Sequence, residues 1–137
     1  MSNIARKFVV KSVMLALLLG GSACDSGEPG NPGTNNQPLP PEAAAGFQLF
    51  NRLGCAVCHS FDNKVIAGPS LRNIYGKEVK LLDGSTLVRD DAYLRSSILE
   101  AGKHVVDGYR PTMINYGSML QDGDIERLLA LIRFYSD

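Results

Sequence analysis

The sequence predicts one small all-α domain with a single β-hairpin, preceded by an export signal and a flexible linker. Three observations support this architecture. The chain has 137 residues, which suits one domain with extensions. Apolar residues recur at helical spacing in three segments, near residues 42–53, 90–101 and 122–135. A tight turn between two strands is predicted where Asp83 and Gly84 stand between apolar residues.

The first 23 residues have the features of a secretory signal peptide. Arg6, Lys7 and Lys11 give a positive start, an apolar run covers residues 13–19, and small residues continue to Ala23. The apolar run is too short for a membrane-spanning helix, which needs about 20 apolar residues. We therefore exclude residues 1–23 from the fold.

Cys24 follows this segment directly and resembles the cysteine of a bacterial lipoprotein signal, which is acylated and becomes the new N-terminus. Gly21 departs from that pattern, in which a larger aliphatic residue is preferred. Two alternatives stay open: ordinary cleavage after Ala23, and a disulfide between Cys24 and another cysteine. Each acyl CH₂ adds roughly 0.8 kcal/mol of membrane affinity. A lipidated Cys24 would therefore hold the protein at the periplasmic side of a bacterial membrane.

Residues 24–41 predict a flexible linker. Five of the seven prolines of the chain lie in residues 25–41, with glycines, asparagines and few apolar residues around them. This composition buries too little surface to offset the entropy of ordering the segment. In a lipidated protein the linker would act as a tether between the anchor and the folded domain.

The charge balance narrows the class of partner. The chain has 14 basic and 14 acidic residues, and removal of the signal leaves 11 basic and 14 acidic residues, a net charge of −3. A nucleic-acid binder would show a basic patch or stripe, so we expect no nucleic-acid partner. A mildly acidic protein instead favours a protein partner with a positive docking patch.

The folded domain is predicted over residues 42–137. Pro41 starts a first helix that Gly54 ends, and Phe47 and Phe50 share one face of it. The hairpin covers residues 79–88. It should lie against the helices, because an isolated hairpin is only marginally stable.

Two further helices complete the domain. Asp90 or Asp91 caps a middle helix that runs to about Ala101, where Gly102 ends it. The last helix covers residues 122–135, with acidic residues near its start, where they suit the helix dipole. Its apolar residues are predicted to form a core stripe: Ile125, Leu128, Leu129, Ile132 and Tyr135.

The chemistry is concentrated in residues 55–59, Cys-Ala-Val-Cys-His, which match the C-x-x-C-H pattern of c-type haem attachment. Two cysteines three positions apart lie on one side of a helical turn, so Cys55 and Cys58 can both reach the vinyl groups of one haem. The adjacent His59 then projects toward the iron. The pattern predicts one covalently bound haem c with His59 as an iron ligand.

Two other interpretations of this pattern fit the sequence less well. A thioredoxin-like dithiol needs a preceding strand in a βαβ unit, whereas a helix is predicted here. A structural zinc site needs four ligands, and the domain offers only Cys55, Cys58, His59 and His104. For the haem iron, a sixth ligand could come from His104, Met113 or Met119. Methionine opposite histidine is the electron-transfer choice, but chemistry alone does not decide between the two methionines, and Met119 could equally be a core residue.

From Gly46 onward the chain resembles class I cytochromes c, and most closely the cytochrome c domain fused to subunit II of some bacterial haem–copper oxidases. The resemblance extends over nearly the whole domain. The segments that carry it are residues 54–59, 68–71, 74–76, 82–86, 92–98 and 108–113.

The resemblance implies a class I cytochrome c fold with helices around the haem, and it assigns individual roles. Met113 falls where the axial methionine of the family stands. Pro69 falls where a proline carbonyl accepts a hydrogen bond from the ligand histidine, here His59, which orients the ring. Ile114 replaces the proline that usually follows the methionine. Two first-helix positions, Gly46 and Phe50, would pack against the last helix at Leu131 and Phe134.

These predictions combine into an exported, membrane-tethered monohaem cytochrome c that is not an enzyme and passes electrons between respiratory protein partners, a terminal oxidase among them. We expect a monomer. One alternative is a subunit held permanently in an oxidase or dehydrogenase complex. Another is a haem sensor or catalyst with a labile sixth ligand, in which Met113 would be a core residue.

Overall fold

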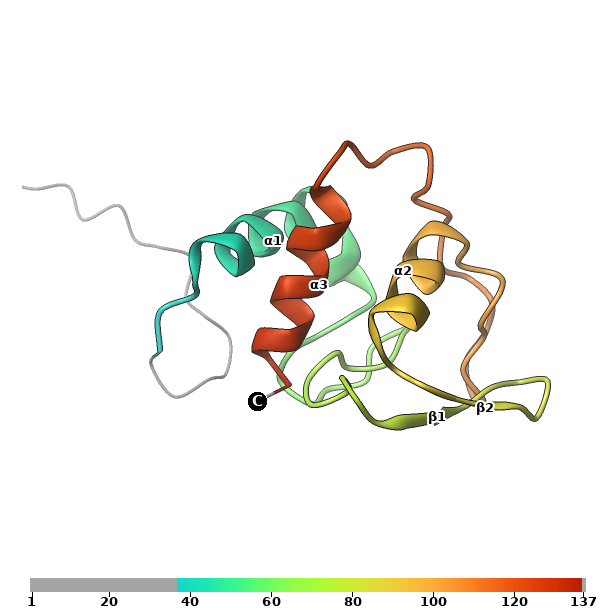
Figure 1. The fold of residues 1–137 in the computed structure, drawn as a ribbon. Coiled ribbons are helices and arrows are strands. Elements are labelled where there is room, and N and C mark those ends of the chain that lie inside the picture. Colours follow the sequence, from blue (N-terminus) through green and yellow to red (C-terminus); the bar gives the residue numbers. More distant parts are fainter. Residues whose placement is uncertain (1–36, 137) are drawn as a thin grey trace, which may run out of the picture.

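The computed structural model describes residues 37–136. The signal segment, Cys24 and most of the linker lie outside these residues, so the predictions made for them stay predictions. The described part contains three helices and one two-stranded antiparallel sheet (Figure 1). None of the described helices has the length and apolar character needed to cross a membrane.

Two helices far apart in the sequence, α1 (Pro41–Arg52) and α3 (Asp124–Phe134), pack across each other and form the centre of the domain (Figure 1). Gly46 allows this approach, because a Cβ atom there would lie 2.1 Å from the backbone oxygen of Arg127 and 3.1 Å from Cβ of Leu131. The predicted contact of Gly46 with Leu131 is therefore confirmed.

The core of the domain lies between these helices and the segments that surround them. An aromatic cluster extends it: the ring centroids of Phe50 and Phe61 are 5.0 Å apart in a tilted pair, and those of Phe61 and Tyr135 are 4.2 Å apart in a stacked pair. The stripe predicted for the last helix is confirmed: four of its members are buried and Ile125 packs against them partly buried. The buried cluster consists of Leu49, Phe50, Phe61, Val79, Leu81, Tyr93, Leu94, Leu128, Leu129, Leu131, Ile132 and Tyr135.

The predicted hairpin is present, with strands β1 (Glu78–Lys80) and β2 (Thr86–Val88) in antiparallel register. Gly84 has a φ of 86°, a left-handed conformation that suits glycine in a tight turn. Val79 and Leu81 are buried in the core cluster, so the hairpin does lie against the helical body. On its other side, Leu81 forms an isolated antiparallel bridge with Val106.

Helix α2 (Asp91–Leu99) begins as predicted but ends earlier. The Asp90 side chain caps it by accepting a hydrogen bond of 2.8 Å from the backbone N–H of Tyr93. The predicted end at Ala101 is wrong. Glu100 leaves the helical conformation, and the backbone N–H of Ala101 donates to the side-chain oxygen of Asn115 at 3.1 Å instead of continuing the helix.

Helix α3 begins later than predicted. Gly123 has a φ of 80° and stands outside the helix, so Asp122 precedes α3 and does not start it. Asp124 and Glu126 do occupy the first turn, where negative charge suits the helix dipole. The Asp124 carboxylate accepts a hydrogen bond from the backbone N–H of Gln121 at 3.0 Å, which fixes the entry of the chain into α3.

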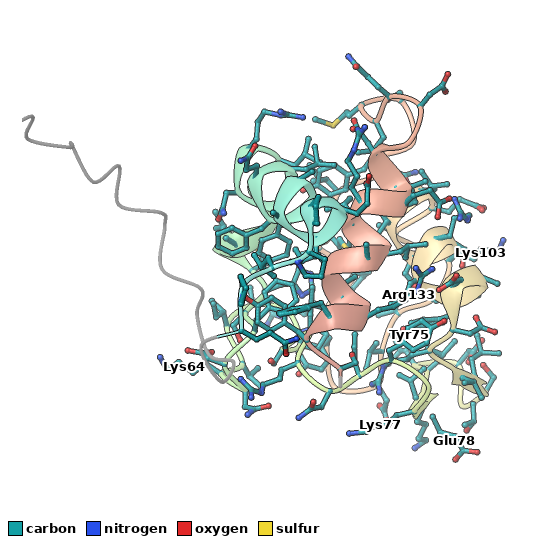
Figure 2. All side chains as sticks on the ribbon, turned by 60° about the vertical axis from the view of Figure 1, so that its left-hand side comes forward. Lys64, Tyr75, Lys77, Glu78, Lys103 and Arg133 are labelled. Carbon is teal, nitrogen blue, oxygen red and sulfur yellow. The ribbon has the colours of Figure 1, made fainter. Side chains whose placement is uncertain are left out.

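A polar cluster joins α2, α3 and the segment before the hairpin. The Asp91 carboxylate accepts hydrogen bonds from the Tyr75 hydroxyl at 2.9 Å and from Nε of Arg133 at 3.0 Å, and it also pairs with the Arg133 Nη2 atom. The guanidinium of Arg133 lies 5.7 Å from the centre of the Tyr75 ring, and Figure 2 shows the two side chains together. These bonds hold the pKa of Asp91 below its usual range.

Candidate functional site

The segment after α1 forms a tight turn that presents both cysteines. Gly54, at a φ of 77°, reverses the chain and starts the 3-10 helix η1 (Cys55–Val57). The Cys55 carbonyl accepts hydrogen bonds from the backbone N–H groups of Cys58 at 3.1 Å and His59 at 2.9 Å. The helical turn predicted for the two cysteines is therefore present, and no disulfide joins Cys55 to Cys58.

The Cys55 thiol is half-buried, and burial raises its pKa above the usual range. Cys55 lies close to Tyr116, whose own pKa is raised by burial. A thiol of this kind stays protonated at neutral pH and is a weak nucleophile, because the thiolate is the reactive form. Nothing in this surrounding activates Cys55 as a redox dithiol of the thioredoxin type would require.

The ring of His59 is held from two sides. Its Nδ1 atom donates a hydrogen bond of 2.8 Å to the carbonyl oxygen of Pro69, so the contact implied by the resemblance is present. Gly68 lies against the ring, since a Cβ there would be only 2.6 Å from Cε1 of His59. The Gly68 N–H also donates to the Cys58 carbonyl at 2.9 Å. With Nδ1 engaged, the Nε2 atom is the nitrogen free to bind a metal.

Met113 lies on the segment that joins α2 to α3, and this segment is anchored just beyond it. The Tyr116 backbone N–H donates to the Ile98 carbonyl at 3.2 Å, and the Tyr116 hydroxyl donates to the Leu53 carbonyl at 3.1 Å. Asn115 is bonded to the backbone after α2, as described above. These bonds hold the methionine-bearing segment against both α2 and the end of α1.

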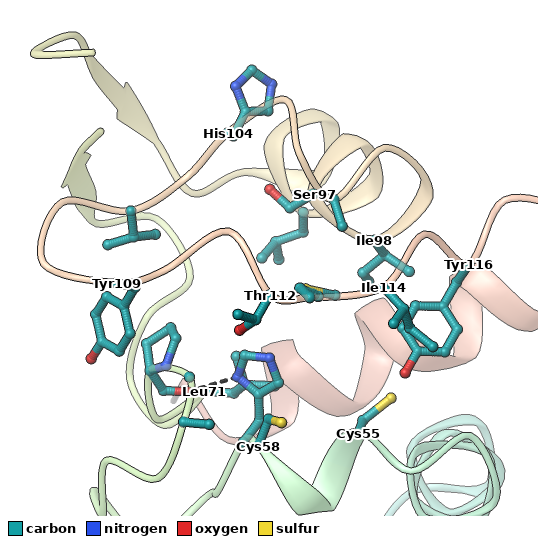
Figure 3. Close-up of a pocket in the computed structure, with 18 of the residues that line it drawn as sticks. Cys55, Cys58, Leu71, Ser97, Ile98, His104, Tyr109, Thr112, Ile114 and Tyr116 are labelled. Carbon is teal, nitrogen blue, oxygen red and sulfur yellow. Dashed lines mark hydrogen bonds between the residues drawn. The ribbon is translucent and has the colours of Figure 1, made fainter. Parts of the chain in front are cut away.

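The cysteines, the histidine and this methionine face one cavity of about 420 Å³ (Figure 3). Its lining includes four residues of the segment that follows α1, Cys55, Cys58, His59 and Pro69. It also includes Met113, from the segment between α2 and α3. Most other lining residues are apolar, and they come from all three helices, the turn around Gly68 and residues 105–116. The volume falls in the range typical of sites for small molecules and cofactors.

The structure distinguishes the three candidate sixth ligands. Met119 does not line the cavity and is 53% exposed, so its interpretation as a core residue is wrong. His104 lines the cavity, but its ring stacks on Tyr93 at 5.6 Å and points away from the cavity in Figure 3. Met113 lines the cavity and is 38% exposed, so it is not a core residue either.

The donor set fits a covalently attached haem. Two thiols and one imidazole project from a single turn, and a thioether lines the same apolar space. Within residues 37–136, no three His, Cys, Asp or Glu side chains gather where they could hold a metal ion. The buried hydroxyl of Ser97, also on the cavity wall, has no hydrogen-bond partner among the described residues, as expected beside a space that a further group fills.

Several lining residues were not identified as site residues from the sequence, namely Arg89, Ser97, Tyr109, Arg110 and Tyr116. Ser97, Tyr109 and Arg110 belong to the segments that carry the resemblance, so they could have been proposed on that basis. Arg89 carries no local signal, because only the pairing of β1 with β2 brings its segment to the cavity.

A scan against protein-family models gives no match for this chain, and a search of curated proteins gives none either.

Proposed function

We propose that this protein is a small exported electron-transfer protein that holds one haem c. Cys55 and Cys58 would form thioethers with the haem vinyl groups, and His59 and Met113 would bind the iron from its two sides. The observation that carries the proposal is that these four side chains, from segments far apart in the sequence, line one apolar cavity. The fold proposed with it is that of a class I cytochrome c.

The surroundings of the ligands support electron transfer over catalysis. A bound haem would supply a one-electron change at its iron, and the protein's part would be to hold the His59 ring and the Met113 segment in place. Pro69 orients the His59 ring and makes it a better donor. The anchors at Asn115 and Tyr116 hold the Met113 segment against α2. If His59 and Met113 both bound the iron, no position would remain for a small molecule to bind there.

Partners would meet the protein at the open side of the cavity. Val57 in η1 is 73% exposed and Ile114 is 54% exposed, and both line the cavity. Electrons would pass there between the cofactor and redox protein partners, a terminal oxidase among them. The proposed location, the periplasmic side of a membrane, depends on acylation of Cys24. We propose a monomer that acts as a carrier.

Mass measurement of the mature protein tests the attachment, because one spectrum reports both the haem and any acyl chains. A mass equal to that of the bare polypeptide would contradict the proposal.

The second test concerns the sixth ligand. Met113→Ala should lower the reduction potential sharply and abolish the weak absorption band of methionine bound to ferric iron, because methionine ligation raises the potential. Met119→Ala is the matched control and should change neither. If Met113→Ala also changes neither, a sensor or catalyst with an open iron becomes the better proposal.

A further inference from the structure

Tyr116 joins two walls of the cavity through its side chain. It lies three residues after Met113, is 6% exposed and lines the cavity. Its hydroxyl donates a hydrogen bond to the Leu53 carbonyl at 3.1 Å. In the described part of the chain, no other hydrogen bond connects residues 108–120 with residues 53–71. The wall that carries the methionine and the wall that carries the cysteines are therefore bonded to each other at this hydroxyl.

The surroundings of this hydrogen bond make it costly to break. Burial raises the pKa of the Tyr116 hydroxyl, so the group stays protonated and remains a donor at neutral pH. The bond to Leu53 is partly buried, and a buried carbonyl that loses its donor keeps the cost of its desolvation. Figure 3 shows the Tyr116 hydroxyl pointing toward Cys55, the first residue of η1. The bond therefore closes the cavity beside one of the two cysteines.

The backbone around the methionine has few hydrogen bonds of its own. Among the described residues, the backbone N–H groups of residues 113–115 find no acceptor. The segment is held from its end instead, since the Tyr116 N–H bonds to the Ile98 carbonyl and the Asn115 side chain accepts from the N–H of Ala101. Both of these bonds lead to α2 or to the residues just after it. The Tyr116 hydroxyl adds the attachment on the cysteine side.

We infer that the Tyr116 hydroxyl keeps Met113 at the iron and thereby excludes small molecules from the sixth position. This inference rests on the proposed function. A thioether at Cys55 would fix the haem to η1, and the Leu53 carbonyl lies only two residues earlier, at the end of α1. The hydroxyl thus ties the methionine segment to the same turn that would hold the haem. Tyr116 is a positioning residue, because it acts through Met113 and does not bind the iron.

The binding of added imidazole to the full-length, haem-loaded ferric protein tests the inference. Imidazole can occupy the sixth position only while Met113 is away from the iron, so its apparent affinity is proportional to the fraction of open molecules. The variant Tyr116→Phe removes the hydroxyl and keeps the ring. The loss of one hydrogen bond should raise the open fraction, and with it the apparent affinity for imidazole, by about 2- to 10-fold.

Tyr75→Phe is the matched control. The Tyr75 hydroxyl also donates one hydrogen bond, to the Asp91 carboxylate at 2.9 Å, but Tyr75 does not line the cavity. Both variants should melt at a lower temperature than the parent, whereas only Tyr116→Phe should bind imidazole more tightly. The parent protein gives a second measurement that needs no variant. In the NMR spectrum of the reduced protein, the hydroxyl proton of Tyr116 should give a separate signal that exchanges slowly with water.

Two results would overturn the inference: equal imidazole affinities of Tyr116→Phe and Tyr75→Phe, or a Tyr116 hydroxyl proton that exchanges as fast as one exposed to water. The second result decides the question even if Tyr116→Phe does not fold. Met113→Ala in the same assay tests the proposed function separately. A parent that binds imidazole as tightly as Met113→Ala contradicts methionine ligation. If Met113→Ala binds far more tightly and Tyr116→Phe matches its control, only the role of Tyr116 is contradicted.

Discussion

Gly46→Ala tests the packing that holds the domain together. The added Cβ would lie 2.1 Å from the Arg127 carbonyl oxygen and 2.8 Å from its carbon, both backbone atoms of α3. Real Cβ contacts are ordinary only beyond 3.4 Å. The two helices must therefore separate by about 1 Å or more, because neither backbone can rotate away as a flexible side chain would. A gap of this size forfeits roughly a quarter to a half of the dispersion attraction across the contact.

The expected loss of stability follows from two opposing terms. Overpacking of a well-packed interior costs about 1–3 kcal/mol, and the backbone clash at Gly46 places this case at the upper end. Alanine regains about 1 kcal/mol over glycine in helix propensity. We therefore expect a net loss of about 2 kcal/mol in the free energy of unfolding. For a domain of this size the melting temperature should fall by about 8–16 °C.

Thermal unfolding followed by circular dichroism measures this change. Gly102→Ala is the matched control, because no atom lies within 4 Å of the corresponding Cβ and the backbone there is unstrained. It should shift the free energy of unfolding by less than about 0.5 kcal/mol. A Gly46→Ala protein that melts with the control, or above it, would refute the close packing of α1 on α3.

Three further predictions concern individual bonds. Asp90→Ala removes the cap of α2 and should lower the free energy of unfolding, measured with denaturant, by about 1 kcal/mol. The control Asp122→Ala, which lies outside α3, should change it by almost nothing, and equal losses in the two variants would contradict the cap. Arg133→Gln should lower the free energy of unfolding above about pH 4, where Asp91 is ionised in both the folded and the unfolded chain. Because the pKa of Asp91 is lowered in the folded protein, the stability that the pair contributes is lost as the pH falls through that folded pKa, so the variant and the parent should converge in acid. A difference in the free energy of unfolding that stays constant in acid would argue against the pair. Gly68→Ala should tilt the imidazole and alter the visible spectrum of the haem-loaded protein, and an unchanged spectrum would contradict the contact.

The sequence predicts correctly those helix ends that are determined by interactions between neighbouring residues. Pro41 and Gly54 bound α1, and Asp90 caps α2, because each acts through its own backbone or its immediate neighbours. The end of α2 was mispredicted because Ala101 is bonded to Asn115, a partner 14 residues away. The start of α3 was mispredicted because Gly123 adopts a left-handed conformation, which its sequence permits but does not require.

The candidate site divides in the same way. The two thiols and the imidazole follow from spacing within five residues, so they were predictable from the sequence. The choice of Met113 over Met119 needed the resemblance, and only the tertiary fold shows which of the two lines the cavity. Arg89 could not be predicted as a lining residue, because its position depends on the register of β1 with β2.

The connection between α2 and α3 is less free than its length implies. It covers residues 100–123, yet residues 105–107 pair with residues 80–82 at the end of β1, and residues 115 and 116 are bonded to the start of the connection and to α2. The stretch that carries Met113 is thereby reduced from 24 residues to the seven at positions 108–114. The entropic cost of closing a loop grows with the logarithm of its length. Shortening the free stretch therefore lowers the cost of holding the Met113 sulfur in place by about 1 kcal/mol. Movements of the Met113 side chain should therefore be brief local fluctuations. For Met113 to leave the cavity completely, the hydrogen bonds that anchor the segment on both sides of it would have to break together.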